Sequence, residues 1–139
     1  MTDLEDLYSK KVMQLFKNPK HVGEIKNADG VASEGNPICG DVMKVFIKIG
    51  RNKRGEEIIK DIRYQTFGCV AAIASSEALC NLAKGKTLKE ALKITSKDIA
   101  DYLGKLPPIK FHCSVLGMAT LHEAIKNYLK KKGQKTEEK

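Results

Sequence analysis

The sequence predicts an α+β fold, in which a small antiparallel sheet is followed by several helices. Alternating apolar residues over 42–49 and again over 58–67 predict two paired strands. The chain after Gly68 carries helical patterns instead. Strands and helices that are separated along the chain are typical of the α+β class. A length of 139 residues fits one compact domain.

The N-terminal third is expected to hold a helix followed by a long loop. Apolar residues recur at roughly helical spacing over residues 3–17, which predicts an amphipathic helix that ends before Pro19. Residues 18–41 are rich in Gly, Asn, Asp and Pro, which favours a loop with one short strand near Val31.

The two longest strands are expected to form a hairpin. Alternate positions in residues 42–49 are apolar, while Lys44 and Lys48 mark the opposite face. The connecting loop contains Gly55, which suits a hairpin turn. The predicted buried residues of the two strands are Met43, Val45, Ile47, Ile49, Ile58, Ile62 and Tyr64.

Three helical segments are expected between the sheet and the last helix. The first begins at Cys69, and Gly85 lies in the position of a C-terminal cap. Two short helices follow, with Thr87 and Ser96 as their N-caps. Thr87 also has a capping-box partner at Glu90.

The last helix is expected to run from near Ser114 to about Lys131. Its core stripe is predicted to comprise Met118, Leu121, Ile125 and Tyr128. Residues 132–139 lack apolar side chains and are expected to form a disordered basic tail. The predicted domain therefore covers residues 1–131.

The composition excludes several classes of protein. Hydrophobic residues make up 42% of the chain and charged residues 30%, unlike a disordered, collagen-like or disulfide-rich secreted protein. The longest uncharged run, residues 64–76, is far shorter than the roughly 20 apolar residues of a membrane span. The N-terminus carries acids rather than an apolar export signal. We therefore expect a cytoplasmic protein that binds no membrane.

The net charge of +8 comes mainly from lysines scattered along the chain. Nucleic-acid binders usually concentrate positive charge on one face, often with arginine and aromatic residues. Here arginine occurs only at positions 51, 54 and 63, and tryptophan is absent. The charge indicates a solvated, lysine-rich surface and no nucleic-acid partner.

Three of the four cysteines lie at borders of predicted elements. Cys39 lies in the loop before the first long strand, Cys69 at the break between strand and helix, and Cys113 near the start of the last helix. Helix N-termini stabilise the thiolate, which is the form that binds metal or attacks sulfur. Cys80 lies within an apolar helical run and is expected to be structural.

Two further candidate ligands adjoin these thiols. Asp41 follows Cys39 by two positions, and His112 directly precedes Cys113. Three cysteines with one Asp or His would form a four-coordinate site for zinc, or for an iron–sulfur cluster held mainly by thiolates. The spacing of the thiols alone matches no generic metal motif. The remaining histidines, at positions 21 and 122, have no cysteine nearby and are expected at the surface.

The neighbouring residues point to one family. The informative segments are GNPICGDVMKVFIKI, IRYQTFGCVAAIASSEAL and LPPIKFHCSVLGMATLHEAI. Over residues 7–131 the chain resembles the IscU/NifU-type iron–sulfur cluster assembly scaffolds, in which the CGD, FGC and HC elements occur together in this order. The resemblance implies a three-stranded antiparallel sheet with about five helices packed on one side.

The resemblance also implies a scaffold rather than an enzyme. Such proteins accept persulfide sulfur from a cysteine desulfurase, accept iron, assemble a 2Fe–2S cluster and pass it to apo-proteins. Carried over by motif, Cys39, Cys69 and Cys113 are the expected cluster ligands, and Cys113 is the expected persulfide acceptor. Asp41 matches an acidic residue whose loss stabilises a bound cluster, and His112 an alternative ligand. Zinc binds the same residues in isolated members.

Partners and alternative functions follow from the same motifs. Residues Leu106 to Lys110, LPPIK, resemble a motif read by a DnaK-type chaperone. Tyr8 matches a residue used in self-association, so a monomer or a homodimer is expected. The first alternative function is a zinc-bound sulfur acceptor of the sulfurtransferase type. The second is a hydrolase that uses Cys113, which is disfavoured because no oxyanion motif is evident.

Overall fold

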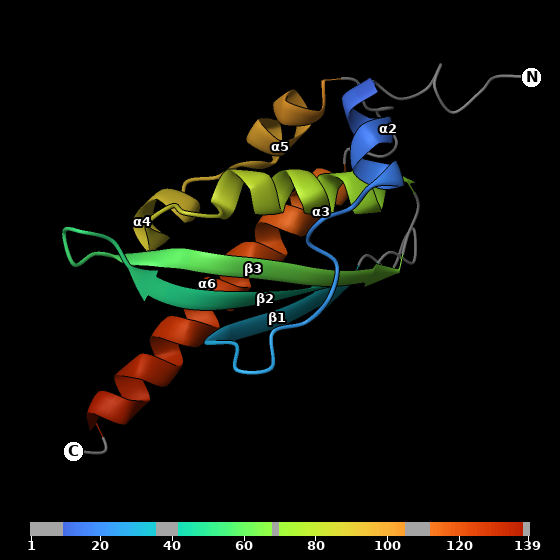
Figure 1. The fold of residues 1–139 in the computed structure, drawn as a ribbon. Coiled ribbons are helices and arrows are strands. Elements are labelled where there is room, and N and C mark those ends of the chain that lie inside the picture. Colours follow the sequence, from blue (N-terminus) through green and yellow to red (C-terminus); the bar gives the residue numbers. More distant parts are fainter. Residues whose placement is uncertain (1–9, 36–41, 68–69, 105–111, 138–139) are drawn as a thin grey trace, which may run out of the picture.

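The computed structural model describes residues 10–35, 42–67, 70–104 and 112–137, and its fold is α+β as predicted (Figure 1). The described elements, in chain order, are α2 (Lys10–Lys17), β1 (Gly30–Gly35), β2 (Val42–Arg51), β3 (Glu57–Phe67), α3 (Val70–Ala83), α4 (Leu88–Ala91), α5 (Ser96–Leu103) and α6 (His112–Glu137). Within these residues no helix is both long enough and apolar enough to cross a membrane.

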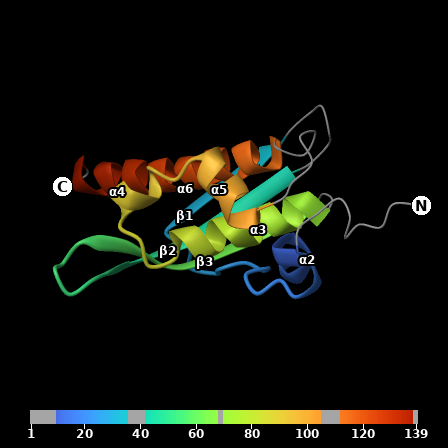
Figure 2. The same cartoon turned by 90° about the horizontal axis from the view of Figure 1, so that it is seen from above.

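The three strands form one antiparallel sheet in the order β1–β2–β3. Met43, Val45 and Ile47 of β2 are fully buried on its inner face, whereas Lys44 is exposed on its outer face. Helix α6 packs against β1 and β2, and α3 packs against β3 and α6 (Figure 2). The structure confirms the antiparallel sheet and the set of helices that the family resemblance implied.

A β-bulge changes which residues of β3 face the core. The register shifts after Lys48, so that Ile49 lies opposite Ile59. The extra residue reverses the alternation of side chains, so Ile59 is fully buried and Ile58 only half-buried. The prediction of Ile58 as a core residue was therefore wrong. The other predicted core residues of this strand, Ile62 and Tyr64, are buried.

The N-terminal elements largely match the prediction. Helix α2 ends at Lys17, before Pro19, and the short strand expected near Val31 is β1. The first part of the predicted helix, residues 3–9, lies outside the described residues.

Residues 18–29, called the strap below, connect α2 to β1; they pair with the free edge of β3 near His21 and then cross the sheet to reach β1 (Figure 1). The backbone N–H of Tyr64 donates to the carbonyl of His21 at 3.0 Å, and the N–H of Gly23 donates to the carbonyl of Tyr64 at 2.9 Å. The strap thus satisfies backbone groups of an edge strand that would otherwise be open to pairing with another chain.

Two glycines adopt positive φ angles that their turns require. Gly55 has a φ of 81° in the hairpin loop, where Asn52 Oδ1 accepts hydrogen bonds from the backbone N–H groups of Arg54 and Glu56. Gly85, just after α3, has a φ of 86°. Both are conformations that side chains with a Cβ rarely adopt, which explains why glycine was a reliable turn signal.

The two short helices begin with capping boxes. Thr87 caps α4 and exchanges hydrogen bonds with Glu90, as the sequence predicts. Helix α5 is capped by Thr95, which exchanges hydrogen bonds with Asp98. The prediction of Ser96 as this cap was wrong by one residue. The acidic partner three positions on identifies Thr95, because a capping box needs that spacing.

The last helix extends further than predicted. It begins close to the expected Ser114 but continues to Glu137, so the end expected near Lys131 was wrong. Lys, Gln and Glu are good helix formers, which favours continuation without apolar contacts. In the predicted stripe Leu121 and Ile125 are fully buried, and Met118 and Tyr128 are partly buried. The division into a domain of residues 1–131 and a tail of residues 132–139 stays a prediction.

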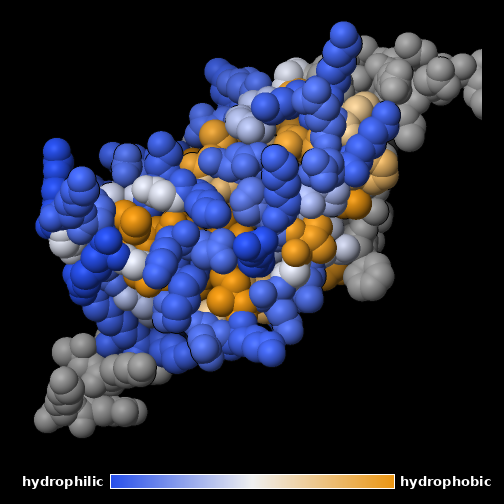
Figure 3. All heavy atoms as spheres, viewed as in Figure 1, coloured by the Kyte–Doolittle hydropathy of each residue, from blue (hydrophilic) through white to orange (hydrophobic). Residues whose placement is uncertain are grey.

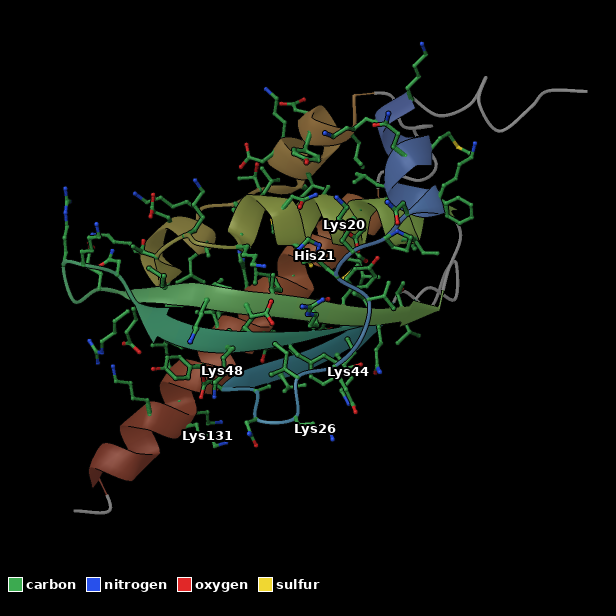
Figure 4. All side chains as sticks on the ribbon, viewed as in Figure 1. Lys20, His21, Lys26, Lys44, Lys48 and Lys131 are labelled. Atoms are coloured by element: carbon green, nitrogen blue, oxygen red, sulfur yellow. The ribbon has the colours of Figure 1, made fainter. Side chains whose placement is uncertain are left out.

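The lysines of the described residues lie on several elements rather than on one. Figure 3 shows a mainly hydrophilic face with apolar patches between the charged side chains. The labelled lysines of Figure 4 come from the strap, from β2 and from α6. This distribution fits the solvated, lysine-rich surface expected from the composition.

Candidate functional site

The candidate ligands fall at the margins of what the structure describes. Cys39, Asp41 and Cys69 lie outside the described residues, as do Tyr8 and the segment Leu106 to Lys110. His112 and Cys113 begin helix α6, but the structure describes only their backbone. Among the described residues, no group of three His, Cys, Asp or Glu side chains could hold a metal ion. The site is therefore located through the elements that border these residues.

The sheet brings two of the three cysteine-bearing segments to one end of its strands. Gly35 at the end of β1 pairs with Val42 at the start of β2, and Val42 also pairs with Phe67 at the end of β3. Residues 36–41, which contain Cys39 and Asp41, connect the first pair. Cys69 follows Phe67 by two positions. Both segments consequently leave the sheet at the same end of its strands.

The start of α6 lies close to this end of the sheet. A Cβ placed on Gly117 would lie 3.8 Å from Met43 Cε and 3.7 Å from Leu79 Cδ2. Gly117 is one helical turn after Cys113, and Met43 is the second residue of β2. The N-terminus of α6 therefore approaches the strand start that follows Asp41.

A side-chain hydrogen bond joins β2 and β3 at this end of the sheet. The Thr66 hydroxyl on β3 donates to the carbonyl oxygen of Val42 on β2 at 2.5 Å. Val42 directly follows Asp41, and Thr66 precedes Cys69 by three positions. The bond adds a fixed point between the strand ends that lead into the two segments.

Cys80 is not part of this arrangement. It is fully buried among the apolar residues of α3, and it is a free thiol. Burial raises the pKa of the Cys80 thiol well above its ordinary value, because the low-dielectric interior disfavours the thiolate. A neutral, inaccessible thiol makes a poor ligand or nucleophile, so the structural role predicted for Cys80 is confirmed.

The sequence reasoning missed a buried, hydrogen-bonded His–Glu pair between the strap and α3. His21 was expected at the surface, but it is buried, and its ring Nδ1 lies 2.9 Å from Glu77 Oε1. The backbone N–H of His21 donates to Glu77 Oε2 at 2.8 Å. A single acid within the apolar run of α3 was the available signal, since a buried carboxylate needs a partner.

Burial and hydrogen bonding act in opposite directions on the pKa of Glu77. Burial would raise the pKa of the Glu77 carboxyl, but hydrogen bonds from the side chain and backbone of His21 outweigh it and lower that pKa. Burial and the adjacent Glu77 together raise the pKa of Tyr64. Glu77 is thus a charged carboxylate inside the core at neutral pH.

The other histidine outside the motifs, His122, is half-buried rather than fully exposed. Its Nε2 atom is buried and has no hydrogen-bond partner among the described residues. The expectation of a surface residue is therefore only partly correct. Among the described residues it belongs to no group of three potential metal ligands.

Comparisons with known proteins agree with this architecture. The family model for the NifU-like N terminal domain matches residues 7–135. The iron-sulfur cluster assembly scaffold protein IscU 1 of Archaeoglobus fulgidus is 50% identical over 128 residues, covering 92% of this chain and 80% of the relative. The IscU scaffold of Aquifex aeolicus is 48% identical over 127 residues, covering 91% and 79% of the two chains.

Solved structures show the same fold at lower identity. The N-terminal part of a NifU-like protein from Brucella abortus superposes with a TM-score of 0.72 at 18% identity, covering 92% of this chain and 98% of that one. A SufU-type protein from Fervidobacterium islandicum gives a TM-score of 0.69 at 24% identity, covering 88% and 99%.

The fold is that of the NifU-like N-terminal domain class. The chain belongs to this family, as one of the IscU-type scaffold proteins of iron–sulfur cluster assembly. Its role is that of a scaffold that carries a cluster transiently rather than that of an enzyme.

Proposed function

We propose that this protein assembles a 2Fe–2S cluster on Cys39, Cys69 and Cys113 and then passes the cluster to apo-proteins. One observation carries the proposal: the elements that border all three cysteines converge on one end of the sheet. Three thiolates supply the soft ligands that iron–sulfur clusters prefer. Asp41 and His112 are the candidates for the fourth ligand.

Asp41 suits exchange better than storage. A hard carboxylate matches a soft iron–sulfur cluster less well than a thiolate does. If Asp41 is a ligand, its bond to iron is the weakest of the set and opens first. His112 is the alternative fourth ligand. Imidazole binds iron and zinc well, so a change from one ligand to the other offers a route to release.

Sulfur enters, in this proposal, through Cys113. The thiolate of Cys113 attacks the terminal sulfur of the persulfide on a cysteine desulfurase. The sulfur–sulfur bond of the donor breaks, the desulfurase cysteine leaves as a thiolate, and Cys113 becomes a persulfide. The position of Cys113 in the first turn of α6 supports this role. A helix N-terminus stabilises a thiolate, by up to about 1 kcal/mol where the site is exposed.

Each persulfide sulfur must gain two electrons to become the sulfide of a cluster. The proposed partners are therefore a cysteine desulfurase, a low-potential electron donor and apo iron–sulfur proteins. A DnaK-type chaperone acting on Leu106 to Lys110 is a further proposed partner. We propose that the protein acts in the cytoplasm, as a monomer or a homodimer.

The experiment that tests the proposal is anaerobic reconstitution with ferrous iron, cysteine, a cysteine desulfurase and a reductant such as dithiothreitol, followed by visible absorption spectra. The expected result is the absorption of a 2Fe–2S cluster, with about one cluster per chain or per dimer. The colour should move to an apo-ferredoxin when that acceptor is added. Zinc binding and sulfur uptake without any cluster would instead support the zinc-bound sulfur acceptor.

A further inference from the structure

The side chain of Glu77 is held at both carboxylate oxygens by one residue of the strap. The backbone N–H of His21 binds Oε2 at 2.8 Å, and the ring Nδ1 of His21 lies 2.9 Å from Oε1. Glu77 is 1% exposed and His21 is 8% exposed. Two contacts in different directions fix the orientation of the carboxylate as well as its distance, and we call this pair the clasp.

The clasp joins two elements, because His21 is also bound to β3. The carbonyl of His21 accepts the backbone N–H of Tyr64, and the next strap residue forms a bridge with the same strand. Figure 4 shows His21 on the strap between α3 and β3. One residue thus fixes the distance between a point on the strand and a point on the helix.

Those two points lie at similar distances from the ends of β3 and α3, between which Cys69 stands in the sequence. Glu77 lies seven residues after the start of α3, about 10 Å along a helix axis. Tyr64 lies three residues before the end of β3, about 10 Å along a strand. Beyond the clasp, the backbone N–H of Gly85 donates to the carbonyl of Ile59 at 2.8 Å and joins the end of α3 to β3 again. The clasp is thus the connection nearer to residues 68–69, and the stretch of chain that it encloses, from Tyr64 to Glu77, contains Cys69.

Loss of the clasp would let α3 turn relative to β3 and would displace the first turn of the helix, which follows Cys69 in the sequence. A rotation of α3 by about 10° moves a point about 10 Å from Glu77 by about 2 Å. Metal–sulfur distances vary by only about 0.2 Å in functional sites, so such a shift exceeds what a ligand tolerates.

The chemistry of the clasp favours a positioning role over simple stabilisation. Burying a carboxylate costs desolvation energy, and apolar residues of the same size often stabilise a core as well as, or better than, a buried charged group with its partner. Apolar contacts are non-directional, however, whereas two hydrogen bonds to one carboxylate fix an angle. The retained pair is therefore explained by the geometry that it enforces.

We propose that His21 and Glu77 are positioning residues that set the angle between β3 and α3 and so place Cys69 for metal and cluster binding. The inference rests on the proposed function, in which Cys69 is a ligand. It concerns two residues outside the cysteine motifs, both on parts of the chain that the structure describes.

The test compares metal affinity with stability in matched variants. Glu77→Gln and His21→Ala weaken the clasp, whereas His21→Asn keeps a side-chain N–H close to the position of Nδ1. The controls are Ile125→Val and Ile125→Ala, which weaken the core at a fully buried position on α6. Zinc affinity is measured by chelator competition, cobalt–thiolate absorption reports the ligand set, and urea unfolding gives stability.

We expect Glu77→Gln and His21→Ala to lower zinc affinity by about tenfold or more, as changes beside a ligand shell commonly do. The cobalt–thiolate absorption should weaken with it, and His21→Asn should recover most of both. The Ile125 variants should change zinc affinity less than about twofold at comparable losses of stability. If Glu77→Gln does not fold, the comparison of His21→Ala with His21→Asn decides.

The proposal is overturned if clasp and Ile125 variants of equal stability lose equal affinity, or if the clasp variants keep wild-type affinity and absorption. Failure of the proposed function looks different. In that case the wild-type chain itself would form no cluster, although the clasp could still affect zinc binding.

Discussion

Individual cysteines of this chain differ in what surrounds them, and their roles should differ accordingly. Replacing Cys39, Cys69 or Cys113 singly with Ser should reduce cluster yield at least tenfold, because a hydroxyl is a far poorer ligand for iron or zinc than a thiolate. Cys80→Ala should leave the yield unchanged, since Cys80 is buried among apolar side chains. Reconstitution followed by visible spectra and iron analysis measures the effect.

Unfolding in urea provides the control for this series. Cys80→Ala removes a buried sulfur and should cost about 1 kcal/mol of unfolding free energy without changing cluster yield. The assignment of ligands would be wrong if Cys80→Ala abolished the cluster while Cys39→Ser preserved it.

The Asp41 carboxylate should govern the lifetime of the cluster. Asp41→Ala is expected to lengthen that lifetime and to slow transfer to an apo-ferredoxin severalfold, because the hardest ligand of the set is lost. Transfer is timed by the change in circular dichroism as the cluster moves between proteins. An unchanged or faster transfer rate would contradict the assignment. Asp41→Asn, which keeps the shape, separates charge from size.

The buried Glu77 carboxylate should make stability depend on pH. Its pKa is lowered in the folded protein, so its contribution is present above the unfolded value of about 4.5 and is lost as pH falls through the folded value. Glu77→Gln should therefore cost about 2 kcal/mol at pH 7 and less below pH 4. Urea unfolding at several pH values measures this. A pH-independent loss would refute it, and Glu24→Gln on the exposed part of the strap is the control.

Sequence reasoning at this scale succeeded where chemistry and position agree. Cys80 was assigned to the core because it stands in an apolar helical run, and it is buried there. The same reasoning placed His21 at the surface, because no cysteine lies near it. Its partner Glu77 is 56 positions away, so only the tertiary fold brings the two together.

At the scale of single elements, the cap of α5 can be tested directly. Thr95→Ala should lower the unfolding free energy by about 1 kcal/mol, because the hydroxyl of Thr95 accepts the backbone N–H of Asp98. Ser96→Ala should change stability by less than about 0.5 kcal/mol, as expected for a position without a special role. Thermal unfolding of the two variants compares them. Equal losses would show that the cap is not at Thr95.

The β2–β3 hairpin shows why the face of a strand residue can be mispredicted even where the extent of the strand is predicted well. Alternation in residues 42–49 gave the correct buried face of β2, since Met43, Val45 and Ile47 are fully buried. In β3 the pattern is broken by the bulge opposite Ile49, where the register shifts. A bulge adds one residue without a sequence signal of its own, so either of the adjacent residues Ile58 and Ile59 could be assigned to the buried face.

For the whole molecule, the convergence of the cysteine segments could not be derived from spacing. Cys39, Cys69 and Cys113 are separated by 30 and 44 positions, which match no local metal motif. Only the order of the strands and the packing of α6 bring their borders to one end of the sheet. The resemblance to a family supplied that topology in advance, because related chains share the fold.

The end of α6 contributes little to this architecture. Figure 1 shows the helix extending beyond the sheet toward the C-terminus. Its last described link to the sheet is at Glu57, which accepts hydrogen bonds from Tyr128 and from Lys132 Nζ. The hydrogen bond from Lys132 and then that from Tyr128 lower the pKa of Glu57. Lys132 is 49% exposed at its side chain, and ion pairs of such groups stabilise proteins by only about 0–1 kcal/mol.

A chain shortened to residues 1–131 should therefore remain a complete scaffold. We expect its unfolding free energy to fall by no more than about 1 kcal/mol, because Tyr128 and the buried residues of α6 are retained. Lys132→Ala in the full chain should reproduce most of that loss. Cluster yield and transfer rate should match those of the full chain, since every candidate ligand is retained. A shortened chain that folds but assembles no cluster would show that residues 132–139 belong to the functional unit, and that the predicted domain boundary is wrong.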